Sequence, residues 1–291
     1  MKPLRRAKLL TDTLNPDHIT TIVDIGANPA GTPPYAMLRR SGCCRIIGFE
    51  PQPDAFARLQ PSKRDCETYL PYAVGDGKPA TLFMTRNSGL VSTLEPETWM
   101  GGYLNRWFHG AAEVLARETI STKRLDDIEE IDHMDFIKID IQGGELNVFE
   151  HGREKMRKTV AIQSEVAFLP YYKGQPSFGD IQSELRAQGF IAHKIVEMAA
   201  HLLDYPFRRL APGMALPASQ LTAVDVIFLR NPITMADLED EMVRHMAILA
   251  DAVFGSFDLT LRCLWELVSR GKVDVADAKR YGSVLPFAQV T

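Results

Sequence analysis

The sequence predicts an α/β protein with a doubly wound, mostly parallel sheet that has an antiparallel edge, followed by a helical C-terminal extension. Short apolar runs alternate with helical stretches along most of the chain, which is typical of parallel βαβ units. Two apolar runs, at 190–196 and 224–229, end this alternation as a pair and predict the antiparallel edge. Beyond residue 232, apolar residues recur at spacings of three and four, which indicates helices.

The bounds of each element follow from the points where apolar runs meet turn and capping residues. Thr32 is expected to cap a helix with Pro33 at its first position, and Gly143-Gly144 to turn a strand into the next helix. In order, we expect a short N-terminal helix within 1–17, a strand ending at Ile25, helix 34–41, strand 45–49, helix 53–60, strands 68–74, 81–85, 119–122 and 136–141, helix 145–151, strand 160–166, helix 178–188, and strands 190–196 and 224–229. The connections 86–118 and 198–221 are long for a compact domain, and we expect them to cover the functional site.

Composition limits the class of protein. A chain of 291 residues with 45% hydrophobic content can fill one sizeable core, which we place in residues 1–231, with 232–291 as the helical extension. A net charge of −4 without a long basic block argues against a nucleic-acid partner. The four cysteines lack C-x-x-C spacing, so we expect reduced thiols, a cytoplasmic location and no structural zinc. The longest apolar stretch, 246–268, carries four charged residues, and the N-terminus lacks a signal-peptide core, so we expect no membrane span.

Two carboxylates at the ends of neighbouring strands indicate a ligand site. Asp24 and Glu50 each lie at or just after the carboxyl end of a predicted strand, which is where α/β proteins bind ligands. The glycines between them do not form G-x-G-x-x-G, and Pro33-Pro34 remove two N–H donors that a pyrophosphate would use. S-adenosylmethionine has a ribose diol and no phosphate, so it fits better than a dinucleotide. Glu50 is expected to accept hydrogen bonds from both ribose hydroxyls.

Candidate catalytic groups lie at the same edge of the sheet. Asp140 ends the strand that is expected beside the first one, and Glu165 ends another. With His201 in the late connection, these are the candidates for a general base, and Glu165 is the first choice. We expect no metal at Asp140 and Glu165, because no further ligand stands at ligand spacing. Aromatic residues that can stack on an acceptor are Trp99, Tyr103, Trp107, Tyr171 and Tyr172.

These motifs together resemble the FkbM-type methyltransferases. The resemblance is carried by VDIGAN at 23–28, GFEP at 48–51, AVGD at 73–76, RLDDI at 124–128, DFIKIDIQGGEL at 135–146 and SEVAFLPYYKGQPSF at 164–178. It implies a Rossmann-like, seven-stranded class I methyltransferase fold that uses S-adenosylmethionine. The cofactor contacts that it implies are Asp24, Gly26, Ala27, Asn28, Glu50, Pro51, Asp76 and Asp140.

The resemblance also implies O-methylation of a hydroxyl on a sugar, glycan or secondary metabolite. Two departures from the family pattern stand out: Pro29-Ala30 displaces a glycine of the cofactor loop, and Gln142 replaces a glutamate that is common in the family. The second departure removes an acid that a base or a metal site would use. A non-catalytic, cofactor-binding scaffold that recruits a partner through its tail is the alternative function, and an NAD-dependent sugar enzyme is disfavoured by the missing glycines.

The C-terminal extension carries an apolar stripe that the resemblance does not reach. Its members are Met235, Leu238, Met242, Met246, Leu249, Val253, Phe257, Leu261, Leu264 and Val268, with a break expected at Gly255-Ser256. Two interpretations stay open, because periodicity cannot show what a face is buried against. The stripe either packs on the domain as a helical hairpin or forms a homodimer through the C-terminal helices, and we lean slightly to the dimer.

Overall fold

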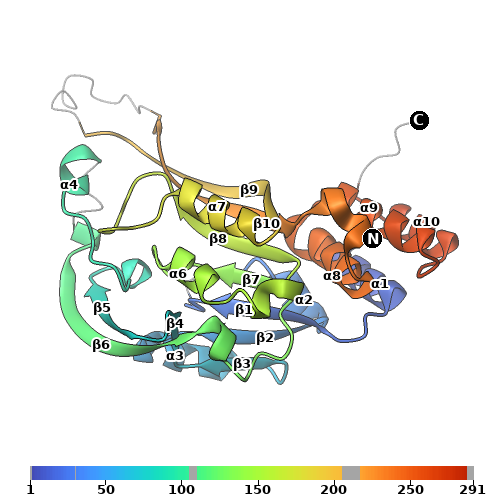
Figure 1. Ribbon diagram of the computed structural model, residues 1–291, viewed down its shortest axis with the longest axis horizontal. Coiled ribbons are helices and arrows are strands. Elements are labelled where there is room, and N and C mark those ends of the chain that lie inside the picture. The colour runs from blue at the N-terminus through green and yellow to red at the C-terminus, as the bar shows by residue number, and fades with distance from the viewer. Residues whose placement is uncertain (1, 30, 105–109, 205–216, 287–291) are drawn as a thin grey trace.

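The computed structural model describes residues 2–29, 31–104, 110–204 and 217–286 (Figure 1). The helices and strands are, in chain order, α1 (Pro3–Leu14), β1 (Thr20–Ile25), α2 (Ala36–Ser41), β2 (Cys44–Phe49), α3 (Pro53–Leu59), β3 (Glu67–Leu70), β4 (Ala73–Gly75), β5 (Pro79–Thr85), α4 (Met100–Tyr103), β6 (Val114–Arg124), β7 (Phe136–Ile139), α6 (Glu145–Glu150), β8 (Ala161–Ala167), α7 (Phe178–Ala187), β9 (Phe190–His201), β10 (Gln220–Arg230), α8 (Asp240–Leu249), α9 (Phe257–Ser269) and α10 (Val275–Gly282). No helix in these ranges is long and apolar enough to cross a membrane.

The main sheet confirms the predicted fold class. Its seven strands have the order β3-β2-β1-β7-β8-β10-β9. Pairing is parallel from β3 to β8, and β10 runs antiparallel to both of its neighbours, β8 and the edge strand β9. The carboxyl ends of β1, β2 and β7 therefore meet at one edge of the sheet, as a doubly wound fold requires.

A second, three-stranded sheet with the order β4-β6-β5 was not predicted. The single strand expected at 68–74 is wrong: it divides into β3 in the main sheet and β4 in the small sheet. Pro71 lies at the division, where its missing N–H cannot continue the ladder. The strand expected at 119–122 is the centre of a much longer strand, β6, which pairs with both β4 and β5.

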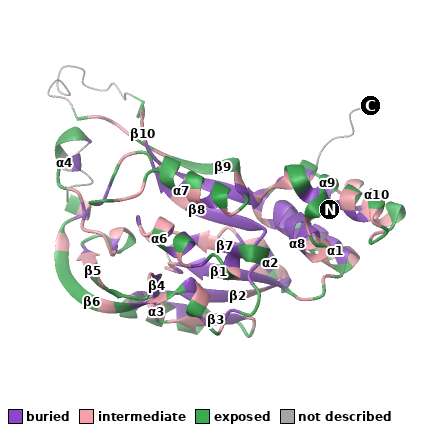
Figure 2. Cartoon of the chain, in the orientation of Figure 1, coloured by how far each residue is buried: buried purple, intermediate pink, exposed green. Residues whose placement is uncertain are grey.

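Two hydrophobic cores lie on opposite faces of the main sheet, because alternate residues of the same strands belong to each. Ile22, Ile46 and Phe136 pack with α1, α2, α8 and α9, whereas Val23, Ile47 and Ile137 pack with α6 and α7. Figure 2 shows the central strands as mostly buried. Figure 1 shows α1, α8, α9 and α10 gathered at one end of the sheet.

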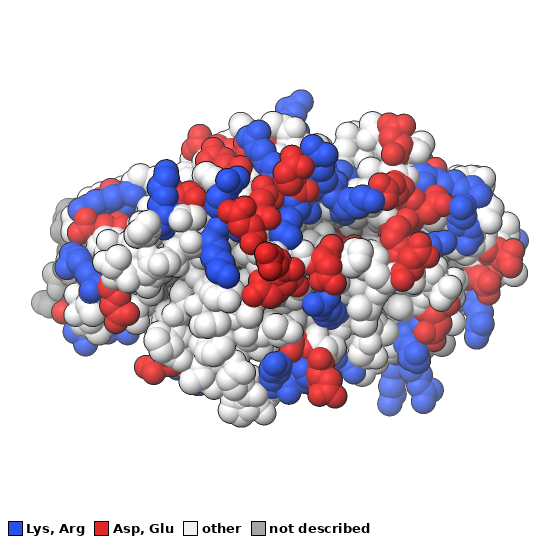
Figure 3. All heavy atoms as spheres, turned by 60° about the horizontal axis from the view of Figure 1, so that its bottom comes forward, with Lys and Arg blue, Asp and Glu red and all other residues white. Residues whose placement is uncertain are grey.

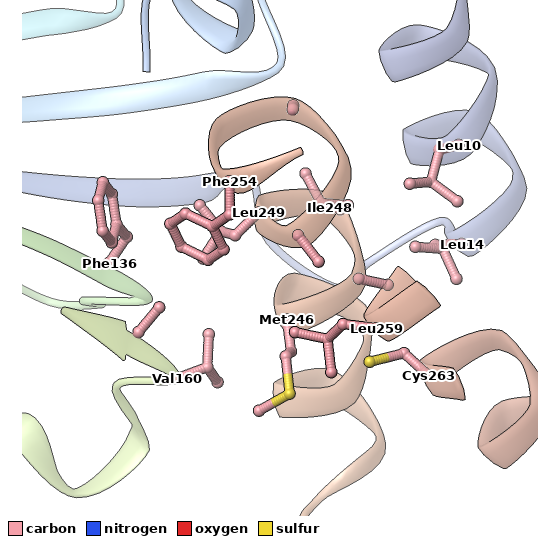
Figure 4. Packing of buried hydrophobic residues seen from close by; sticks show 14 of the residues in the cluster. Leu10, Leu14, Phe136, Val160, Met246, Ile248, Leu249, Phe254, Leu259 and Cys263 are labelled. Carbon is pink, nitrogen blue, oxygen red and sulfur yellow. The ribbon is translucent and has the colours of Figure 1, made fainter. Parts of the chain in front are cut away.

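The C-terminal stripe packs within its own chain. Met242, Met246, Leu249 and Leu264 belong to the first of these cores. Figure 4 shows Met246 beside Leu259, and Leu249 beside Phe254 on the side of Phe136 of β7. The expected break is present, since a π-helical turn at Ala250–Phe254 ends at Gly255 with φ +59°.

Packing of the C-terminal helices against their own domain is what the helical-hairpin interpretation predicts. The homodimer stays a prediction that light scattering of the full chain can test. Leu261 and Trp265 remain exposed on α9, and a dimer through this helix would use them.

A buried ion pair joins the two ends of the chain. Arg6 Nε of α1 lies 2.7 Å from Asp251 Oδ1, and the side chains of both residues are almost completely buried. The Tyr281 hydroxyl of α10 donates to the same oxygen at 2.7 Å. Breaking such a pair by removing one partner costs about 3–5 kcal/mol, because an uncompensated charge stays buried.

Candidate active site

The turn after β1 is held tightly against β2 and β7. The N–H groups of Gly26 and Ala27 both donate to the Phe49 carbonyl at 3.0 Å, and the Asp140 N–H donates to the Ile25 carbonyl at 3.1 Å. Gly26 has φ +81°, and a Cβ on it would lie 2.1 Å from the Asp140 carbonyl oxygen. Only glycine fits here, so the sequence Asp-Ile-Gly brings the ends of three strands together.

A first cavity of about 170 Å³ opens at these strand ends. Its apolar walls come from both sheets and include Phe49, Tyr72, Val74 and Leu82, and Ser88 to Thr93 close one side. This part of the connection 86–118 therefore covers the site, as predicted. The cavity combines a flat apolar slot with a few polar groups, which is typical of cofactor pockets.

Two acceptor side chains project into this cavity. Glu50 is 2% exposed, and its Oε1 accepts the N–H of Gln52 at 2.9 Å. Burial raises the pKa of Glu50 above its usual value, since little in the protein compensates the charge. Asn28 Oδ1 is buried and has no hydrogen-bond partner among the described residues. Both groups therefore offer unused acceptor capacity to a ligand with hydroxyl or ammonium donors.

A second cavity of about 580 Å³ lies against the polar part of the sheet face. Asp24, Lys138 and Gln163 are direct neighbours across β1, β7 and β8. Asp225 of β10 is in register with Glu165, two residues along β8 from Gln163, and with Glu197 of β9. All of these residues except Glu165 line the cavity. Asn28, Lys138 and Asp140 line both cavities, so these three residues mark the junction.

One lysine faces two carboxylates at the junction. Lys138 Nζ lies 3.6 Å from Asp24 Oδ1 and 3.8 Å from Asp140 Oδ2. Burial alone would favour the neutral amine, but these two carboxylates raise the pKa of Lys138 above its usual value. The Tyr35 hydroxyl donates to the other oxygen of Asp24. Lys138 thus acts as the charge partner of neighbouring carboxylates.

Gln142 connects Asp140 to Glu165. Its Nε2 donates to Asp140 Oδ1 at 2.8 Å and to Glu165 Oε2 at 3.1 Å, and its Oε1 accepts the Tyr172 hydroxyl at 2.9 Å. Burial, followed by the charges of nearby carboxylates, raises the pKa of Glu165 well above its usual value. A glutamate at position 142 would bring a third carboxylate to this point, whereas the amide donates to both that are present.

The family model for the methyltransferase FkbM domain matches residues 24–192, which include all residues that line the first cavity and most of those that line the second. The chain belongs to the FkbM methyltransferase family. This confirms the resemblance and identifies the protein as an S-adenosylmethionine-dependent methyltransferase. A comparison with curated proteins finds no match.

Solved structures similar to this FkbM protein are also methyltransferases. A putative methyltransferase from Thermoplasma acidophilum is 14% identical, with a TM-score of 0.36 over 74% of this chain and 69% of that one. Precorrin-6y C5,15-methyltransferase from Geobacter metallireducens is 12% identical, with a TM-score of 0.35 over 78% and 87%. Magnesium protoporphyrin IX methyltransferase from Synechocystis is 10% identical, with a TM-score of 0.35 over 78% and 76%.

The first cavity fits the cofactor of the FkbM family. Glu50 and Asn28 provide the unused acceptors that a ribose diol and an ammonium group need, and Gly26 keeps the turn clear of a Cβ.

The predicted cofactor residues of this FkbM protein lie in the first cavity, in the second cavity and, in the case of Asp76, outside both. Gly26, Asn28, Glu50, Pro51 and Asp140 line the first cavity; Asp24, Ala27, Asn28 and Asp140 line the second. Asp76 lies in the turn between β4 and β5, where its Oδ1 accepts the Lys78 N–H at 2.9 Å, and it lines neither cavity.

The remaining candidates lie outside both cavities. Glu165 contacts Gln142, and His201 Nδ1 lies 2.9 Å from Thr222 Oγ1. Tyr171 and Tyr172 are buried in a third apolar cluster. Trp99 and Tyr103 contact each other near the surface, with ring centroids 6.0 Å apart. Trp107 lies outside the described residues.

Sequence reasoning missed Gln163, Asp225 and Glu197 as cavity residues. Asp225 had a detectable signal, because it is an acid inside the apolar run 224–229. Its position beside Gln163, whose Nε2 donates to Asp225 Oδ2 at 2.8 Å, depends on strand order. Strand order is not visible in the pattern of one strand.

The stability of the protein is expected to depend on pH through the buried carboxyl group of Glu145. Its Oε1 accepts the N–H groups of Ile141 and Gly143 at 3.0 and 3.2 Å, which fixes the Gly143-Gly144 turn. Burial raises the pKa of Glu145 from 4.5 to about 7, and these two bonds oppose the rise only in part. The folded state therefore binds this proton more tightly than the unfolded chain, and its contribution to stability is lost as pH rises from 4.5 through 7.

We expect Glu145→Gln to flatten this pH dependence, because the amide oxygen can still accept both bonds and carries no charge. From pH 5 to pH 8, the free energy of unfolding of the parent should fall relative to that of the variant by about 3 kcal/mol. Urea denaturation at the two pH values measures the difference. Parallel curves for the two proteins would contradict the raised pKa.

Proposed function

We propose that this protein transfers the methyl group of S-adenosylmethionine to a hydroxyl of a sugar, glycan or secondary metabolite that is rich in hydroxyl groups. The observation that carries the proposal is the second cavity, which adjoins the cofactor cavity at Asn28, Lys138 and Asp140. Its carboxylates and amides accept hydrogen bonds, and hydroxyl groups are the donors that match them.

The charge of this cavity disfavours phosphorylated acceptors. Four carboxylates and two cationic groups line this cavity. The carboxylates belong to Asp24, Asp140, Glu197 and Asp225, and the cations are Lys138 and Arg39. Phosphate groups would be repelled by this excess of carboxylates, whereas a neutral polyol would not. On the face shown in Figure 3, lysine and arginine alternate with aspartate and glutamate and form no continuous basic surface. This supports the proposal that nucleic acid is not the acceptor.

Asp140 is the best placed general base. It is the only one of the three predicted candidates that lines either cavity, and it lines both. In the proposed reaction the sulfonium of the bound cofactor supplies the methyl group, and Asp140 accepts the proton that the attacking hydroxyl loses. Gln142 Nε2 donates one hydrogen bond to Asp140 Oδ1 and another to Glu165 Oε2, so Glu165 helps to position Gln142. Glu165, the first choice from sequence, is the alternative base.

The direct test is methyl transfer from isotopically labelled S-adenosylmethionine to a panel of neutral sugars, acidic sugars and hydroxylated aromatic compounds. We expect labelled products whose methyl group resists mild alkali, as an ether does and a methyl ester does not. Transfer only to nitrogen, carboxylate or nucleic-acid acceptors would overturn the proposal. Cofactor binding without turnover on any acceptor would favour the non-catalytic scaffold.

A further inference from the structure

Three potential metal ligands converge at the end of the sheet opposite the two cavities. His18 precedes β1, and Glu241 and His245 lie four residues apart on α8, so they share one face of that helix. One ligand atom from each residue lies within 4.8 Å of the others. The group is separate from the cofactor and acceptor cavities, because none of its members lines either one.

The distances between these atoms suit a small divalent ion. His245 Nε2 lies 3.0 Å from Glu241 Oε1, and His18 Nδ1 lies 3.4 Å from the same oxygen. Zinc binds histidine nitrogen and carboxylate oxygen at about 2.0–2.2 Å in a tetrahedron, which places neighbouring ligand atoms about 3.3 Å apart. The three side chains therefore need only small adjustments to bind one ion.

Both histidines are oriented by a partner on their second nitrogen. His18 Nε2 lies 3.1 Å from Asp135 Oδ2, and His245 Nδ1 lies 3.0 Å from Thr20 Oγ1. Asp135 is itself fixed, since its Oδ2 accepts the Thr21 N–H at 2.7 Å. A carboxylate or hydroxyl on the far nitrogen of each histidine is the arrangement that metal-binding histidines have. It selects Nδ1 of His18 and Nε2 of His245 as ligand atoms.

The two oxygens of Glu241 have different partners. Its Oε2 contacts Arg244 Nη1 at 3.1 Å, and its Oε1 faces the histidines. Oε1 also accepts the N–H groups of Asp17 and His18 at 2.7 and 3.3 Å, and the ion would displace the longer of these two bonds. The fourth direction opens into a cavity of about 530 Å³ that all three ligands line. Three protein ligands with one open position is a stable coordination for zinc.

We propose that His18, Glu241 and His245 bind one zinc ion, with the fourth position filled from this cavity. The ion would connect the segment before β1 to α8, and so join the two parts of the chain on either side of residue 231. The expectation of no metal concerned Asp140 and Glu165, and it does not address this site.

Calorimetric titration of the full chain with zinc, after treatment with a chelator and dialysis, tests the proposal. We expect one ion per chain and a higher melting temperature with zinc, since an ion that binds only the folded state stabilises it. His18→Ala and Glu241→Gln should each weaken zinc binding by at least roughly 100-fold, beyond the 10- to 100-fold expected from losing the orienting carboxylate in Asp135→Asn.

The matched control is His133→Ala. His133 stacks on His18 with ring centroids 4.1 Å apart but is not one of the three converging ligands, so zinc affinity should be retained. Binding of S-adenosylhomocysteine to each variant shows that it is folded, and His18→Gln serves if the alanine variant is not. The proposal is overturned if the parent shows no saturable zinc binding in the micromolar range, or if His133→Ala lowers zinc affinity as much as His18→Ala.

Discussion

Asp140→Asn is expected to lower the turnover number by about 10²- to 10⁴-fold at saturating cofactor, the usual contribution of a general base. The asparagine keeps the size of the side chain, but its single oxygen replaces the two that face Lys138 and Gln142. It cannot accept the proton from the acceptor hydroxyl. Single-turnover methyl transfer measures the loss, and calorimetry with S-adenosylhomocysteine separates it from weaker cofactor binding, because Asp140 also lines the cofactor cavity.

Glu165→Gln is the matched comparison. Glu165 lines neither cavity and reaches Asp140 only through Gln142, so its loss should reduce turnover less than Asp140→Asn. The dissociation constant of the cofactor should not change. The reverse order, with the larger loss in Glu165→Gln, would assign the base to Glu165. Loss of activity with EDTA that magnesium restores would instead indicate a metal at these carboxylates.

Glu50→Ala is expected to weaken S-adenosylmethionine binding by at least roughly tenfold, because it removes charge-assisted hydrogen bonds to the ribose. The fold should persist, since among the described residues the side chain makes one hydrogen bond within the protein, to the Gln52 N–H. Since burial raises the pKa of Glu50, the parent should also bind the cofactor less tightly as pH falls toward that pKa. Calorimetry measures the affinity, and circular dichroism checks the fold.

Asp76→Asn is the control for the cofactor site. The family resemblance implied a cofactor contact at Asp76, but this residue lies in the turn between β4 and β5 and lines neither cavity. Its substitution should leave the dissociation constant within about twofold of the parent, a change of less than about 0.5 kcal/mol. Equal losses in both variants would mean that the cofactor extends over β4.

The cofactor cavity could be predicted from the sequence because the residues that mark it lie close together along the chain. Asp24, Gly26 and Glu50 lie at or beside the ends of two consecutive strands, and parallel strands present these ends at one edge. The grouping of Asp24, Lys138 and Asp225 could not be predicted, because it depends on the order β1-β7-β8-β10. The small sheet escaped prediction for a related reason: β4 and β6 are distant in sequence, and Pro71 is the only local sign that the first strand ends there.

The C-terminal helices show a different limit of sequence reasoning. Their period and the break at Gly255 were visible. The surface that these helices cover could not be predicted, because Met246 and Leu249 pack against strands that carry apolar residues on both faces. The convergence of His18 with Glu241 and His245 likewise joins positions more than 200 residues apart, and no spacing rule reaches that far.

The contact between Arg6 and Asp251 sets an order of events during synthesis. The two residues are 245 positions apart, so at 5–20 residues per second the partner of Arg6 is made roughly 12–50 s after Arg6 itself. Until then α1 has α2 beside it but lacks its ion-pair partner and the apolar surface of α8 and of the π-helical turn Ala250–Phe254, which belong to the same core as Leu10 and Leu14. Helix α1 therefore completes its packing only after the C-terminal helices are made. A nascent chain that stalls before residue 251 would present this apolar face to chaperones.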